Sequence, residues 1–107
     1  MITSARLSLL VARAATEKKA LDVVRINLKK LTDIADYFVI GEGETDRQLR
    51  AIADNVLEQA AVEGCRPSRV EGYQEGSWLL VDFDVVVAHF LLPGERTYYD
   101  LEGLWRC

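Results

Sequence analysis

The chain begins with an amphipathic pattern. Between residues 4 and 20, the apolar residues Leu7, Leu10, Val11 and Ala14 recur at helical spacing. Residues three and four positions apart lie on the same side of a helix, so these four would form one apolar face. The pattern predicts a first helix that packs this face against a core.

A second helical pattern follows near the middle of the chain. Thr45 and Gln48 have the spacing of a capping box, in which side chains bind the unpaired backbone donors at a helix start. Gly64 is well placed to end the helix. The apolar stripe between these signals consists of Leu49, Ile52, Ala53, Val56 and Ala60. A shorter third helix is predicted over residues 97–104.

Five segments are typical of β-strands. They cover residues 22–28, 36–40, 69–72, 77–83 and 86–92. The last two are almost continuously apolar, which is typical of strands inside a sheet. The order α-β-β-α-β-β-β-α predicts one α/β domain over residues 1–107, with a mixed sheet of about five strands flanked by helices.

The hairpin between the last two strands predicts which side chains share a face. A two-residue loop at 84–85 would place Leu80 opposite His89 and Trp78 opposite Leu91. Opposed residues project to the same side of a sheet. That side would carry Trp78, Leu80, Asp82, Val87 and His89. Because two long helices cover only one face, we expect the other face to receive the short third helix and an outside partner.

Composition and charge narrow the class of partner. Half of the residues are apolar and 28% are charged, as in an ordinary soluble globular protein. Thirteen basic and seventeen acidic residues give a net charge of -4. This sign argues against nucleic acid as the main contact and favours a basic protein partner. No apolar run is long enough for a membrane span.

Two features bear on the cellular compartment. Residues 1–16 contain Arg6 and Arg13 and no acid, as a transit peptide would, although the apolar face favours a helix of the domain. Cys65 and Cys107 lack the spacing of a metal-ligand or redox pair. We expect two free thiols in a reducing compartment, and hence a cytoplasmic protein.

The chain offers one candidate arrangement for enzyme chemistry. Asp82 and Asp84, two positions apart on a strand, could hold Mg²⁺ for nucleotidyl transfer, and the glycines of the GEGET segment could bind a phosphate before a helix. However, Glu42, Glu44 and Asp46 make that segment acidic, and Asp84 is also a typical turn residue. We therefore predict a protein that is not an enzyme, with no catalytic residue, metal or cofactor. The nucleotidyltransferase stays as the alternative.

His89 is the only histidine, so a site with several histidine ligands is ruled out. A single histidine in an apolar strand is usually a packed structural residue. Its expected position beside Trp78 and Asp82 favours a binding role more than usual.

Several motifs together resemble the ribosomal silencing factor (Iojap) family. The resemblance runs from about Ala14 to Trp105. It is carried by Lys18-Lys19-Ala20, residues 36–40, Arg47-Gln48, residues 51–54, Glu71-Gly72, Trp78, Asp82, His89, Arg96, residues 99–102 and Leu104-Trp105. The chain has Asp84-Val85 where the family usually has Gly-Asp, which predicts a less tight turn and an incidental Asp-x-Asp pattern. It has Glu42 and Thr45 where the family often has a small residue and Ser.

The resemblance implies a nucleotidyltransferase-like fold without the activity. It implies binding to the fourteenth protein of the large ribosomal subunit, on the surface that faces the small subunit. Occupying that surface would block subunit joining and lower translation when nutrients are scarce. Relatives in mitochondria and chloroplasts serve large-subunit assembly. A homodimer of the free chain, or a homodimeric assembly module with no ribosomal role, is left open.

We predict the contact surface from the hairpin register and the aromatic segment RTYYDLEGLW. Trp78 would be a rigid anchor, since aromatic residues and Arg supply most binding hot spots. Asp82 and Glu102 would offer carboxylates to basic residues of the partner. The full predicted surface is Trp78, Leu80, Asp82, His89, Tyr98, Tyr99 and Glu102. The alternative is that Trp78 belongs to the core.

Overall fold

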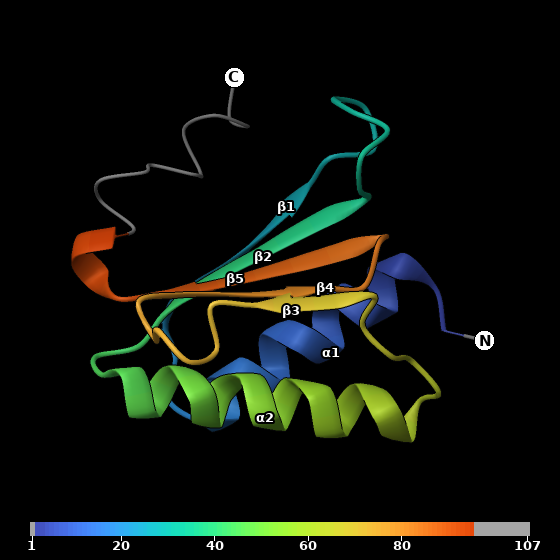
Figure 1. Cartoon of the computed structure of the whole chain (residues 1–107). Coiled ribbons are helices and arrows are strands. Elements are labelled where there is room, and N and C mark those ends of the chain that lie inside the picture. The colour runs from blue at the N-terminus through green and yellow to red at the C-terminus, as the bar shows by residue number, and fades with distance from the viewer. Residues whose placement is uncertain (1, 96–107) are drawn as a thin grey trace.

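The computed structural model describes residues 2–95 and shows two long helices and five strands in that part of the chain, followed by a short helical segment at residues 93–95 (Figure 1). In chain order they are α1 (Ser4–Glu17), β1 (Leu21–Asn27), β2 (Tyr37–Glu42), α2 (Asp46–Val62), β3 (Arg69–Glu71), β4 (Trp78–Asp82) and β5 (Val86–Leu91). Each predicted element within these residues is confirmed. The boundaries differ slightly, because α1 ends at Glu17 and β2 continues to Glu42. The predicted helix 97–104 lies outside the described residues.

The five strands form one mixed sheet in the order β1-β2-β5-β4-β3. β2 and β5 run parallel, and the other neighbouring pairs are antiparallel. β5 is therefore the central strand, and every residue of β5 is buried. This confirms that the two most apolar strands lie inside the sheet.

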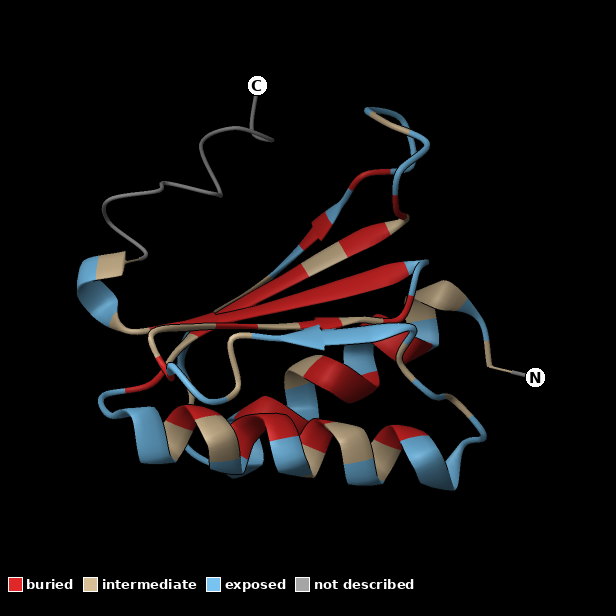
Figure 2. Cartoon of the chain, viewed as in Figure 1, coloured by how far each residue is buried: buried red, intermediate tan, exposed pale blue. Residues whose placement is uncertain are grey.

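Both helices cover the same face of the sheet (Figure 1). The predicted apolar faces of α1 and α2 are buried against β2, β4 and β5, whereas the outer side of α2 is exposed (Figure 2). Among residues 2–95, no helix covers the opposite face, which we call the open face. The expectation that two long helices would leave one face without a helical cover is confirmed for these residues.

The start of α2 differs in one detail from a capping box. The Gln48 backbone N–H donates to Thr45 Oγ1 at 3.1 Å, as predicted. However, Gln48 Oε1 accepts from the backbone N–H of Glu44 at 2.7 Å, not from that of Thr45. Gln48 Nε2 also donates to the carbonyl oxygens of Lys18 and Lys19. The helix start is thereby tied to the end of α1.

The β4–β5 hairpin closes with a two-residue loop. The Phe83 backbone N–H donates to the Val86 carbonyl at 2.8 Å. Asp84 adopts a left-handed φ of 70°, which Asp tolerates better than most residues. Its N–H donates to Asp82 Oδ1 at 2.7 Å. The expectation of a less tight turn is wrong, because this bond holds Asp84 in the conformation that glycine would otherwise supply.

Candidate partner-binding face

The open face is built from alternate residues of all five strands. The observed register pairs Trp78 with Leu91 and Leu80 with His89, as predicted. Side chains from β1 and β2 complete an apolar cluster on this side of the sheet. By register and contact, the open face carries Val24, Ile26, Phe38, Ile40, Arg69, Glu71, Trp78, Leu80, Asp82, Val87, His89 and Leu91.

Trp78 and His89 form a hydrogen-bonded pair at the centre of this face. Trp78 Nε1–H donates to His89 Nδ1 at 3.2 Å. The His89 ring also meets Phe38 edge-to-face, with 4.8 Å between ring centroids. Burial lowers the pKa of His89 to about 4, and the nearby Asp82 carboxylate opposes this only in part. His89 is therefore neutral near neutral pH and accepts the indole proton.

His89 lies beneath the surface rather than on it. Its exposed fraction is 5%, and its Nε2 is buried with no hydrogen-bond partner among residues 2–95. Trp78 and Leu80 are only partly buried, so they can both pack on the sheet and contact another molecule. The geometry gives His89 the role of fixing the direction of the Trp78 indole. Tyr98, Tyr99 and Glu102 lie outside the described residues.

Asp82 is held by bonds to its own chain. Its Oδ1 accepts from Asp84 N–H, and its Oδ2 lies 3.4 Å from Arg69 Nη2. Arg69 also pairs with Glu71 at 2.8 Å. Because both oxygens have partners and the side chain is 17% exposed, a partner's cation would have to compete with Arg69 for Asp82.

The carboxylates of the alternative enzyme site have structural roles. β4 ends at Asp82, and Asp84 lies in the turn, where the alternation of a strand no longer fixes its direction. Asp84 Oδ1 accepts from Ser68 Oγ at 3.0 Å. Within residues 2–95, no three His, Cys, Asp or Glu side chains are grouped so that they could hold a metal ion. The Asp-x-Asp pattern is therefore explained by the hairpin itself.

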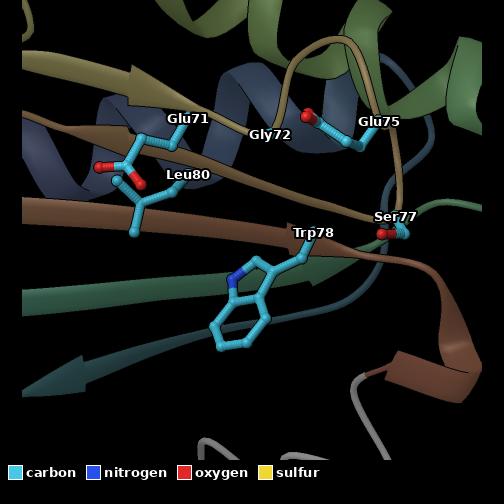
Figure 3. A pocket seen from close by; sticks show the side chains of 6 residues that line it. All are labelled: Glu71, Gly72, Glu75, Ser77, Trp78 and Leu80. Carbon is cyan, nitrogen blue, oxygen red and sulfur yellow. The ribbon is translucent and has the colours of Figure 1, made fainter.

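The sequence did not indicate a pocket that opens beside Trp78 (Figure 3). Its volume is about 470 Å³. Its walls are Glu71, Gly72, Glu75, Ser77, Trp78 and Leu80. In the sequence, the pocket could have been suspected only from the two glycines Gly72 and Gly76, which indicate a turn shortly before Trp78. Both have positive φ.

Two further features concern the surroundings of the site. Cys65 is a free thiol, while Cys107 lies outside the described residues. In the part of the chain from residue 2 to 95, no helix has the length and apolar character needed to cross a membrane.

Together these features define a class of protein: a small α/β module with one face covered by helices and an open face bearing apolar, aromatic and acidic side chains. Comparison with known proteins specifies the family. The model of the family described as "Ribosomal silencing factor during starvation" matches residues 2–107. The chain therefore belongs to the ribosomal silencing factor family.

Individual relatives agree with this assignment. A ribosomal silencing factor of Halalkalibacterium halodurans is 41% identical over 96 residues, which cover 90% of this chain and 82% of the relative. A mouse protein named for mitochondrial assembly of the ribosomal large subunit is 35% identical, over 83% of this chain and 40% of its own. A crystal structure from Chromobacterium violaceum has a TM-score of 0.94 and 33% identity, covering 97% of this chain and 87% of the other.

Proposed function

We propose that the protein binds the large ribosomal subunit through its fourteenth protein and sterically blocks joining of the small subunit, notably when nutrients are limiting. Membership of the ribosomal silencing factor family supports this proposal. The name of the mouse relative refers to the large subunit, which agrees with it. The structural observation that carries the proposal is the open face, where Phe38, Trp78 and Leu80 stay only partly buried over a buried apolar cluster and neither α1 nor α2 covers them. Such partly exposed apolar side chains suit an outside partner.

Trp78 is the anchor of the proposed contact. A partly buried indole, fixed by a hydrogen bond to His89, loses little freedom on binding. Leu80 extends the apolar contact, and Tyr98, Tyr99 and Glu102 are proposed to continue it. The net charge of -4 would favour encounter with a basic ribosomal protein. The similarity to bacterial ribosomal silencing factors favours a place in the cytoplasm, where bacterial ribosomes work.

Sedimentation with isolated subunits tests the proposal. The purified protein should pellet with large subunits but not with small ones. It should also inhibit formation of joined ribosomes in proportion to the large subunits occupied. Equal pelleting with both subunits, or normal joining in excess protein, would refute it.

A homodimer of the free chain is the competing state. Two copies that pair through their open faces would bury the surface proposed for the ribosome. Analytical ultracentrifugation of the free protein measures this directly. If the free protein is a dimer and does not pellet with large subunits, it is an assembly module without a ribosomal role.

A further inference from the structure

The pocket beside Trp78 lies where the β3–β4 loop meets the open face. Figure 3 shows Glu71 and Leu80 on neighbouring strands, Trp78 further along β4, and Glu75 and Ser77 on the loop. The β3–β4 register pairs Glu71 with Leu80, so their side chains project to the same side. The pocket is thus continuous with the proposed contact surface.

The loop that closes the pocket is held in place by α2. Gly76 N–H donates to the Gly72 carbonyl at 3.0 Å, which closes the turn. Tyr73 Oη donates to Asp54 of α2 at 2.9 Å. Arg50 of α2 donates to the Tyr73 carbonyl at 3.4 Å. Because one bond closes the loop on itself and the other two fix it to α2, the pocket is preformed and a ligand does not have to order it.

The lining combines negative charge with apolar surface. Glu71 and Glu75 contribute carboxylates, Trp78 and Leu80 contribute apolar surface, and no basic side chain of residues 2–95 lines the pocket. Arg69 pairs with Glu71 at 2.8 Å from outside the pocket, so a partner's cation has to compete with Arg69 for Glu71, as it does for Asp82. No ion pair within residues 2–95 involves Glu75. The pocket therefore suits a cationic group with an apolar stem.

We propose that this pocket takes one arginine side chain of the protein partner, with the guanidinium between Glu71 and Glu75 and the stem over Trp78 and Leu80. This inference rests on the proposed function, which supplies a basic protein as partner. Arginine suits the pocket better than lysine because its planar guanidinium stacks on an indole and binds carboxylates through several N–H groups. A bound metal ion is a poorer fit, because two carboxylates alone give it too few ligands.

Charge-neutralising variants test the pocket on the intact protein. Equilibrium binding to isolated large subunits is measured for the wild type, Glu71→Gln, Glu75→Gln and the double variant. Gln preserves size, and breaking the exposed Glu71–Arg69 pair has little effect on folding, which thermal melts check. We expect the double variant to bind about tenfold more weakly, mainly through faster dissociation, because the paired charges are enclosed in the interface. Glu58→Gln, an exposed acid of α2 in the helix layer, is the matched control and should bind like the wild type.

The outcomes separate this inference from the proposed function. If the wild type and the double variant bind large subunits equally, the arginine pocket is wrong and the proposed function stands. If the wild type does not bind large subunits, the proposed function fails. The pocket is then decided by titrating the isolated protein with argininamide and following the backbone amide signals of Gly72 and Ser77. Saturable shifts that the double variant lacks would support it, whereas equal shifts with glycinamide, or none at all, would overturn it.

Discussion

At the scale of single residues, the Trp78–His89 pair connects the core to the open face. A neutral His89 uses Nδ1 to accept the indole proton, so its own proton is on Nε2. That nitrogen is buried and has no hydrogen-bond partner in the described part of the chain, and a buried donor without a partner is unfavourable for folding. In return, the indole has one fixed direction. We infer that the buried Nε2 lowers the folding stability, while the hydrogen bond between the two side chains makes Trp78 a preformed anchor.

The lowered pKa of His89 predicts a pH dependence of stability. The folded-state pKa is about 4 and the ordinary value is 6.5, so between these values the unfolded chain binds a proton that the folded chain does not. The contribution of neutral His89 is complete above pH 6.5 and is lost as the pH falls toward 4. The loss should reach roughly 3 kcal/mol at most. Urea unfolding across this window measures it.

The control for this pH dependence is His89→Gln, which removes the titrating group and keeps a hydrogen-bond acceptor. The variant should lack this part of the pH dependence and retain only that of the carboxylates. Identical slopes for the wild type and the variant would show that His89 titrates normally in the folded protein.

Trp78→Ala should weaken binding to large subunits without unfolding the protein. Loss of an aromatic anchor weakens binding by roughly 2 kcal/mol or more, about thirtyfold in affinity. Because Trp78 is only partly buried, we expect its removal to destabilise the fold less than a core truncation would. Thermal melts and subunit binding are measured on the same preparation. Val62→Ala, at an exposed position of α2, is the control. Unfolding of Trp78→Ala, or unchanged binding by the folded variant, would place the contact elsewhere.

At the scale of elements, the β3–β4 turn depends on a glycine at its first position. Gly72 has a φ of 76°, and a Cβ added there would clash with the backbone oxygen of Trp78. Gly72→Ala should therefore destabilise the protein by roughly 3 kcal/mol, from the left-handed conformation plus the clash. Gly64 has a similar φ of 77° but open space around it. Gly64→Ala should cost only about 1 kcal/mol. Chemical denaturation measures the free energy of unfolding of both variants. If Gly72→Ala and Gly64→Ala lose the same amount, the loop has moved to relieve the contact between the new Cβ and the Trp78 oxygen.

The segment before α2 should not bind a nucleotide. Glu42, Glu44 and Asp46 surround the helix start with negative charge, which would repel a triphosphate. Gln48 already bonds the Glu44 N–H, so one donor that a phosphate would use is occupied. Calorimetry with ATP or CTP and Mg²⁺ should give no measurable heat of binding. Low-micromolar affinity that disappears in Asp82→Asn would contradict this expectation and favour the enzyme alternative.

The helices and the hairpin were predictable because short-range patterns determine them. The α2 stripe alone identifies its core face, and all five of its residues are buried. A two-residue loop likewise fixes the β4–β5 register. The pocket was not predictable, since the loop carrying Glu75 is held by Tyr73–Asp54 and Arg50 contacts between distant segments. The engagement of Asp82 by Arg69 also required the β3–β4 register.

At the scale of the whole molecule, the two faces of the sheet have different surroundings. One face packs on α1 and α2 and forms the larger core, while the other forms a smaller apolar cluster around Phe38 and Ile40. Substitutions on the exposed side of α2 can therefore change the overall charge without touching the open face. This separation allows long-range attraction to be distinguished from direct contact.

The net charge of -4 predicts how salt should affect binding to large subunits. Long-range attraction accelerates encounter and is screened beyond about 10 Å at 0.1 M salt. The association rate should therefore fall steadily as salt rises, while the dissociation rate changes little. Glu71→Gln/Glu75→Gln should instead raise the dissociation rate at every salt concentration. Stopped-flow association and chase experiments measure both rates. The opposite result would be a wild-type dissociation rate that rises with salt as steeply as the association rate falls. In that case exposed ion pairs, and not the Trp78 anchor and the enclosed pocket, would hold the complex together.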